Sequence, residues 1–186
     1  VSSPNTPGLR ALQKRAALDR LLAALAPARG TTPLFLKIAP DLEVGDEADI
    51  AALCIEHGLA ALIVSNTTVA RPPGLCSPHA EEAGGLSGRP LFERSTRLLA
   101  RMAIRLGGRV PLIGVGGIAS GADAYAKIRA GATALQLYTA LVYQGPALIG
   151  RILAELDASL ARDGFHQVGD AVGVDSELLA GADPAG

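Results

Sequence analysis

Short apolar segments alternate with amphipathic segments along this chain, and that alternation restricts the fold more than any other feature. Hydrophobic periodicity predicts four strands, at 33–38, 59–65, 110–115 and 133–138. It also predicts helices, at 8–26, 47–58, 91–108, 122–131 and 146–162, with a short one near 175–180. Apolar strands that alternate with helices predict a parallel sheet covered by helices.

Two α/β architectures contain such a sheet: the doubly wound open sheet and the (β/α)₈ TIM barrel. A complete barrel takes about 250 residues. This chain has 186 residues and four predicted strands, so it would supply roughly the C-terminal half of a barrel. No internal linker, repeat or low-complexity segment divides it, and we expect one domain over 1–186.

Composition and charge exclude several classes of protein. Hydrophobic residues make up 49% and the mean hydropathy is +0.31, which is typical of a globular chain. The net charge is −1 without a basic block, so we expect no nucleic-acid partner. No apolar run has the length of a membrane span. Cys54 and Cys76 lack metal-ligand spacing and the three histidines are scattered, so we expect no metal site and no disulfide.

Polar residues gather where the predicted strands end, which is where ligands bind in α/β folds. Lys37 lies inside an apolar strand, and alternation places it on the same face as Phe35. A lysine that faces a barrel interior needs an anionic or electron-rich partner, whereas on an edge strand it would be solvated. The run SNTT at 65–68 suits a polar planar ligand and equally an ordinary cap or turn.

Glycine-rich motifs end the third strand and the long loop before it. In IGVGGIASG (113–121), glycines let backbone N–H groups approach a phosphate, although the full dinucleotide fingerprint is missing and a tight turn is the alternative. LQLYTA (135–140) ends the fourth strand. Barrels commonly bind phosphate after their last two strands, so this pair of motifs favours a barrel. In the loop 66–91, GGLSGRP would contact a cofactor or hinge a lid. Cys76 and His79 suggest a nucleophile and base, but no third group is evident.

Six motifs in order resemble the dihydroorotate dehydrogenases. They come in that family's order with similar spacing: SSPNTPGLR, LKIAPDL, SNTT, GGLSGRPL, IGVGGIASG and LQLYTALVYQGP. The resemblance as a whole covers essentially all of 1–162. The resemblance implies an FMN-dependent (β/α)₈ barrel enzyme, an oxidoreductase that converts dihydroorotate to orotate in pyrimidine biosynthesis.

The resemblance also assigns catalytic and substrate-binding roles. The SSPNTPGLR loop would lie over the flavin and carry the catalytic base, Ser3. A neutral hydroxyl is a poor base, so Ser3 would need a relay through Thr6 and an ordered water in a closed site. Three residues match positions that hydrogen-bond the pyrimidine and its carboxylate: Asn5, Asn66 and Thr67.

The cofactor-binding roles follow in the same way. Lys37 matches the lysine that sits against the flavin ring, where a cation favours the reduced, anionic form. The other matching FMN contacts are Ser65, Gly88 and Gly117, with Tyr138 and Thr139 at the phosphate end.

Ser3 distinguishes between the two classes of the family. Class 1 enzymes use cysteine at this position, and class 2 enzymes, which are quinone-linked and peripheral on the cytoplasmic side of the inner membrane, use serine. By this resemblance, the first barrel strands and the membrane-docking helices would precede Val1. The alternatives are another FMN barrel acting on a different pyrimidine, a phosphate-binding lyase or isomerase, and an inactive half-barrel with exposed strand edges.

Overall fold

Four parallel strands form one sheet in the computed structural model, which describes residues 1–43 and 45–181. The strands lie side by side in chain order: β1 (Phe35–Ile38), β2 (Ala61–Val64), β3 (Leu112–Val115) and β4 (Ala134–Gln136). When right-handed crossovers connect each strand to the next one along the sheet in the same direction, their helices all lie on one face of the sheet. A doubly wound sheet reverses its strand order at a switch point, and this sheet does not. The order is that of consecutive barrel strands.

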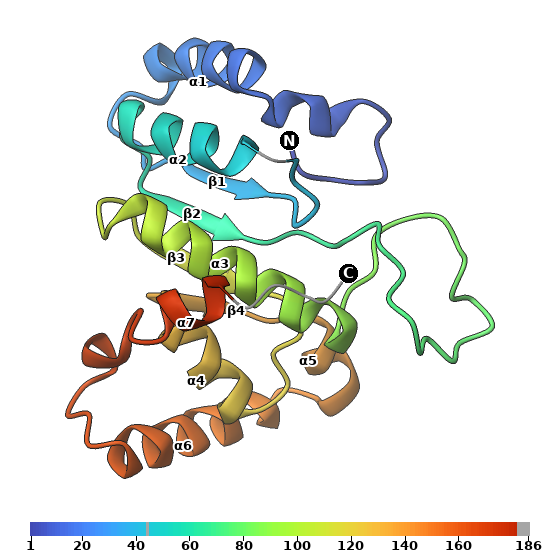
Figure 1. The fold of residues 1–186 in the computed structure, drawn as a ribbon, viewed down its shortest axis with the longest axis vertical. Coiled ribbons are helices and arrows are strands. Elements are labelled where there is room, and N and C mark those ends of the chain that lie inside the picture. Colours follow the sequence, from blue (N-terminus) through green and yellow to red (C-terminus); the bar gives the residue numbers. More distant parts are fainter. Residues whose placement is uncertain (44, 182–186) are drawn as a thin grey trace.

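Helices separate the strands and follow the last one (Figure 1). The α-helices are α1 (Arg15–Arg29), α2 (Asp46–Glu56), α3 (Phe92–Leu106), α4 (Gly121–Arg129), α5 (Thr139–Gln144), α6 (Ala147–Arg162) and α7 (Ser176–Gly181). Three short 3₁₀ helices complete the described elements: η1 (Leu9–Gln13), η2 (Arg89–Leu91) and η3 (Val168–Ala171).

Two helix predictions are corrected by the structure. The helix predicted over 8–26 is divided at Lys14, whose backbone is extended (φ −67°, ψ 140°), into η1 and an α1 that continues to Arg29. Apolar residues at i and i+3 stay aligned in a 3₁₀ helix as well as in an α-helix, so the pattern could not separate the two. The short helix α5 was not predicted, because six residues carry too little periodicity to distinguish them from a loop.

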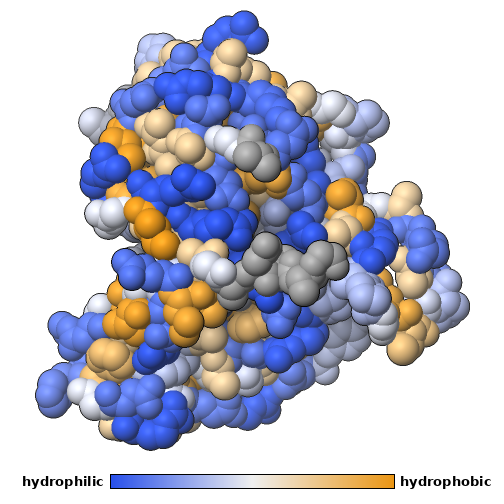
Figure 2. All heavy atoms as spheres, in the orientation of Figure 1, coloured by the Kyte–Doolittle hydropathy of each residue, from blue (hydrophilic) through white to orange (hydrophobic). Residues whose placement is uncertain are grey.

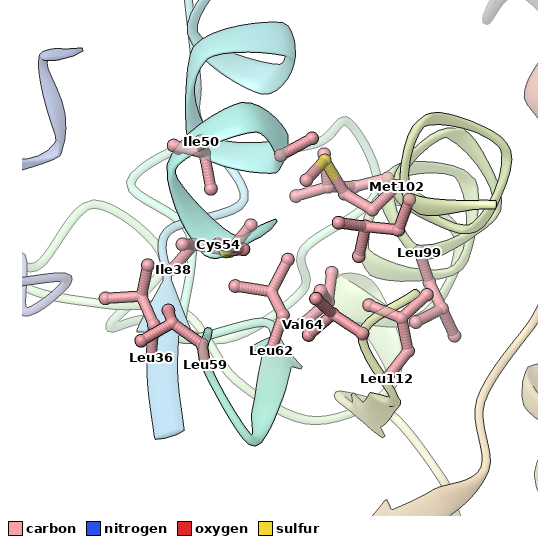
Figure 3. Packing of buried hydrophobic residues seen from close by; sticks show 14 of the residues in the cluster. Leu36, Ile38, Ile50, Cys54, Leu59, Leu62, Val64, Leu99, Met102 and Leu112 are labelled. Carbon is pink, nitrogen blue, oxygen red and sulfur yellow. The ribbon is translucent and has the colours of Figure 1, made fainter. Parts of the chain in front are cut away.

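The main core lies between one face of the sheet and the helices α2 and α3. In Figure 3, strand residues such as Leu36, Leu62 and Leu112 point toward Cys54 of α2 and Met102 of α3. Burial raises the pKa of the Cys54 thiol to about 12, which suits a residue that packs as a small hydrophobe. Hydrophilic residues predominate on the outer surface around α1 and α2 (Figure 2).

Within residues 1–43 and 45–181, no helix covers the opposite face of the sheet. Phe35 is 51% exposed at one end of β1, and Lys37, Ile63 and Ile113, which lie in register across three strands, are half-buried. The predicted division of β1, with Phe35 and Lys37 on one face and Leu36 on the other, is confirmed by the burial pattern. This face is the one that would point into a barrel.

Candidate active site

A pocket of about 610 Å³ opens at the carboxyl ends of the four strands. Its lining includes Lys37 of β1, and Asn66 and Thr67, which follow β2. Gly117 follows β3 and Thr139 follows β4 on the same wall. Parallel strands all present their carboxyl ends at one edge, so residues distant in sequence meet there. The volume is in the range of ligand and cofactor sites.

Other predicted site residues also line this pocket. Ser65 lies at the end of β2, Gly88 at the end of the long loop, and Tyr138 just before α5. A methyl group on Gly88 would come within 3.2 Å of Thr139 Cγ2, so these two predicted cofactor contacts are direct neighbours. The structure therefore brings together every residue that was predicted to contact the cofactor.

Lys37 projects a cation into the pocket. Its side chain is half-buried, and among residues 1–43 and 45–181 its ammonium forms no ion pair and no hydrogen bond. A partly buried charge without a protein partner is costly unless a ligand or water satisfies it. Lys37 thus favours an anionic or electron-rich occupant.

The glycine loop after β3 packs tightly against the start of α3. Gly117 has a φ of 74°, and a methyl group there would lie 2.5 Å from Phe92 Cβ. Gly116 has a φ of 113°, with Ser95 Oγ at 2.7 Å from the same hypothetical atom. Only glycine combines this backbone conformation with this close approach. The loop therefore presents its backbone, and not side chains, to the pocket.

A charged cluster that sequence reasoning missed lies near this loop. Arg89 lines the pocket, pairs with Asp123 and lies over the ring of Phe92 at 5.0 Å. The fully buried Lys127 donates to Ser95 Oγ at 2.6 Å and lies 5.1 Å from the centre of the same ring. Burial lowers the pKa of Lys127 to about 7, against an opposing effect of Asp123. The sequence signal that could have indicated this cluster is the i, i+4 spacing of Asp123 and Lys127, which places the two side chains close together on a helix.

The N-terminal loop lies beside the pocket residues that follow β2, although its predicted site residues do not line the pocket. Asn66 Nδ2 donates to Ser2 Oγ at 3.1 Å, which holds the loop against the end of β2. Ser3 Oγ accepts a hydrogen bond from the backbone N–H of Asn5 at 3.2 Å. Thr6 is exposed and does not hydrogen-bond Ser3. The structure thus connects Ser3 to Asn5, and the relay from Ser3 through an ordered water to Thr6 stays a prediction.

The long loop between β2 and η2 is closed at its base and braced inside. Thr68 and Leu86 exchange backbone hydrogen bonds of 3.1 and 2.7 Å. Arg71 donates to three carbonyl groups of the returning segment. The loop projects from the carboxyl end of β2 in Figure 1. His79 pairs with Glu82 and the Cys76 thiol donates to Gly74 O, so each of these two side chains has a partner other than the other one.

Two negative findings concern the described residues alone. Within 1–43 and 45–181, no three His, Cys, Asp or Glu side chains are grouped as metal ligands would be. In the same part of the chain, no helix combines the length and the apolar character that crossing a membrane requires.

A sequence model of the family described as dihydroorotate dehydrogenase matches residues 1–160. The chain belongs to the dihydroorotate dehydrogenase family. It is 57% identical over 179 residues to the dihydroorotate dehydrogenase (quinone) of Parvibaculum lavamentivorans, covering 96% of this chain and 51% of that protein. The mitochondrial dihydroorotate dehydrogenase (quinone) of Oryza sativa is 55% identical, over 94% of this chain and 39% of its own length.

Solved structures agree with this assignment. The ligand-free DHODH of Eimeria tenella superposes with a TM-score of 0.86 at 42% identity, covering 94% of this chain and 54% of that one. The chain spans about half the length of the curated relatives it matches. The predicted family and the prediction of a partial (β/α)₈ barrel are therefore confirmed.

Membership of the dihydroorotate dehydrogenase family implies a flavin cofactor, and the residues present fit one. A flavin nucleotide has a planar ring that favours a cation when reduced, and a phosphate at the other end. Lys37 provides an unpaired cation in the wall of the pocket. The backbone of Gly116 and Gly117, close to the guanidinium of Arg89, provides a surface suited to an anion. Leu91 and Ile118 contribute apolar walls.

Proposed function

We propose that this chain is the C-terminal part of an FMN-dependent enzyme that oxidises (S)-dihydroorotate to orotate, with a quinone as electron acceptor, in pyrimidine biosynthesis. The main support is the 57% identity to enzymes named dihydroorotate dehydrogenase (quinone). Lys37, which faces a pocket at the strand ends, provides further support, because its cation favours an anionic or electron-rich ligand such as a flavin.

Within this proposal, the pocket residues hold FMN. Lys37 would hold the ring, and Ser65, Gly88 and Gly117 would contact the nucleotide through hydroxyl and backbone groups. Tyr138 and Thr139 would hold the phosphate end; Thr139 Oγ1 donates to Ser87 Oγ at 3.1 Å. When bound, the flavin accepts the hydride that leaves C6 of dihydroorotate, and the quinone later removes those electrons.

Ser3 is proposed as the base that takes the C5 proton of the substrate. Its hydroxyl accepts from Asn5 N, which orients its oxygen but does not remove its proton. A hydroxyl becomes an effective base only when its own proton can pass onward in a site that excludes bulk water. Thr6 with an ordered water is the proposed route, and it requires the site to close over Thr6, whose side chain is exposed.

Three further residues are proposed to bind the substrate. Asn66 and Thr67 line the pocket, and Asn5 lies on the loop beside them. The Asn66 side chain is already oriented, since Oδ1 accepts from Thr67 N at 2.8 Å and Nδ2 donates to Ser2. Amide and hydroxyl groups suit the alternating donors and acceptors of a pyrimidine ring.

The quinone partner is proposed on the names of the relatives, and the membrane contact on the resemblance of the Ser3 loop to class 2 enzymes. We propose a peripheral location on the cytoplasmic side of the inner membrane, through sequence outside this chain.

An anaerobic titration of the complete, FMN-loaded gene product with dihydroorotate tests the proposal. We expect dihydroorotate to bleach the flavin absorbance, and a quinone, but neither fumarate nor NAD, to restore it. A flavin that stays oxidised with dihydroorotate but is bleached by another dihydropyrimidine would reassign the substrate. A product that binds no FMN would support the inactive half-barrel.

A further inference from the structure

Arg10 contacts three separate segments with one guanidinium group. It belongs to η1, directly after the N-terminal loop. Its Nη1 donates to Asp41 Oδ2 at 2.9 Å, its Nη2 to the carbonyl of Thr67 at 2.8 Å, and its Nε to the carbonyl of Ser2 at 3.3 Å. All three nitrogens of the group are therefore used, each on a different segment.

Asp41 connects the same region to the base of the long loop. It follows β1, and its carboxylate accepts from Thr68 Oγ1 at 2.5 Å and from the backbone N–H of Val69 at 2.9 Å. Arg94 of α3 lies 3.5 Å from the same carboxylate. The carboxylate of Asp41 thus lies beside the bridge between Thr68 and Leu86 that closes the long loop.

The pair is shielded from solvent more than an ordinary surface ion pair. The side chains of Arg10 and Asp41 are 21% and 16% exposed, whereas those of Arg15 and Asp49, paired at 3.1 Å nearby, are 48% and 42% exposed. Exposed pairs contribute little, and shielded pairs with full hydrogen bonding hold geometry more strongly. The flat fork of arginine, which lysine lacks, makes the three contacts possible at once.

Two of the carbonyl groups that Arg10 contacts belong to, or adjoin, residues with proposed chemical roles. The carbonyl of Ser2 belongs to the peptide that joins Ser2 to Ser3, and the carbonyl of Thr67 belongs to a residue that lines the pocket. A single guanidinium therefore sets the separation between the peptide of the proposed base and that of a proposed substrate contact.

We propose that Arg10 and Asp41 are positioning residues that hold the loop carrying Ser3 against the end of β2. This inference rests on the proposed function for the role of Ser3. Neither Arg10 nor Asp41 is among the residues that line the pocket. It acts by placing Ser3, and misplacement of a reacting group by about 1 Å can slow a reaction about 100-fold.

The test compares four variants of the complete, FMN-loaded gene product. Arg10→Lys keeps the charge but removes the fork, Arg10→Ala removes both, and Asp41→Asn removes the charge at constant size. Arg15→Ala is the matched control, since it removes an exposed pair from the next helical segment. The readouts are the rate constant of flavin reduction at saturating dihydroorotate, FMN content, and hydrogen exchange of the amides in 2–8 and 66–69.

We expect the Arg10 and Asp41 variants to retain FMN and to exchange these amides faster. Their rate constant of reduction should fall about 10- to 100-fold, with Arg10→Lys between wild type and Arg10→Ala. Arg15→Ala should match wild type in reduction rate constant, FMN content and hydrogen exchange. Wild-type reduction and exchange in Arg10→Ala would overturn the proposal. Losses that track only with lost FMN or a lower Tm in every variant would also overturn it, by showing a purely structural role.

The two proposals fail in different ways. If dihydroorotate does not reduce the wild-type flavin, the proposed function fails. Hydrogen exchange still decides whether Arg10 and Asp41 hold the loop, because it requires no turnover.

Discussion

The side-chain amide of Asn66 donates a hydrogen bond to the hydroxyl of the buried Ser2, 3.1 Å away, across 64 residues of sequence. The side-chain oxygen of Asn66, Oδ1, accepts a hydrogen bond from the backbone N–H of Thr67. Asn66 is thus held in one orientation before any substrate arrives, and Ser2 and Ser3, neighbours in the chain, have different surroundings.

The first prediction separates these two serines. Ser2→Ala should raise KM for dihydroorotate about fivefold, because one hydrogen bond of about 1 kcal/mol that orients Asn66 is lost. Ser3→Ala should lower the rate constant of flavin reduction strongly and leave FMN bound, because it removes the proposed base. Steady-state and stopped-flow kinetics of the two variants check this. Equal effects on KM and on the rate constant would contradict separate roles.

The second prediction concerns Lys37. Lys37→Ala should weaken FMN binding to the apoprotein or slow its reduction, because it removes the unpaired cation of the pocket wall. Fluorescence titration of FMN and anaerobic reduction measure the two effects. Lys14→Ala is the control, since Lys14 is paired with Glu43 on the surface. Unchanged FMN affinity and reduction in Lys37→Ala would show that Lys37 merely faces solvent.

The third prediction compares two glycines with almost the same φ. Gly117 and Gly145 have φ values of 74° and 73°, but a methyl group meets Phe92 only at Gly117. Gly145 combines this φ with an extended ψ of 176°, so Gly145→Ala should cost about 1–3 kcal/mol of stability from the backbone conformation alone. Gly117→Ala should cost about 1–3 kcal/mol more, from overpacking, and should weaken FMN binding. Urea unfolding measures the difference, and equal losses would refute the packing explanation.

The fourth prediction is a pH dependence from Lys127. Its pKa is lowered to about 7 in the folded protein, against 10.5 for an ordinary lysine. Between these values the unfolded chain binds more protons than the folded one, so the contribution of Lys127 to the free energy of unfolding rises with pH across this window.

The variant Lys127→Met removes this rise. Near pH 7 it should be neutral or stabilising by about 1–4 kcal/mol, and this advantage should shrink as the pH approaches about 10. Ser95 keeps its hydrogen bond to Leu91 O at 2.9 Å in the variant, so no buried group is left without a partner. Free energies of unfolding across this pH range check the sign, and parallel curves for the two proteins would disprove it.

Much of the site was predictable because its residues are local to strand ends. Lys37 lies one residue before the end of β1, and Asn66, Gly117 and Thr139 follow later strands. Parallel strands bring their carboxyl ends together in any α/β fold. The motif order then identified the family. The relay from Ser3 to Thr6 stays a prediction, because it depends on side-chain conformations within a loop and not on the strand-end pattern.

The sequence by itself determined the strand–helix alternation, the face of β1 that carries Lys37, and the family. Its repeating apolar pattern and the type and order of its strand-end residues carry that information. The tertiary structure alone decided which distant residues meet, as Arg10 meets Asp41 and Lys127 meets Ser95. Such pairs join segments about 30 residues apart through side chains of no periodic pattern, so only the packing of α3 on α4 and of η1 on the strand ends creates them.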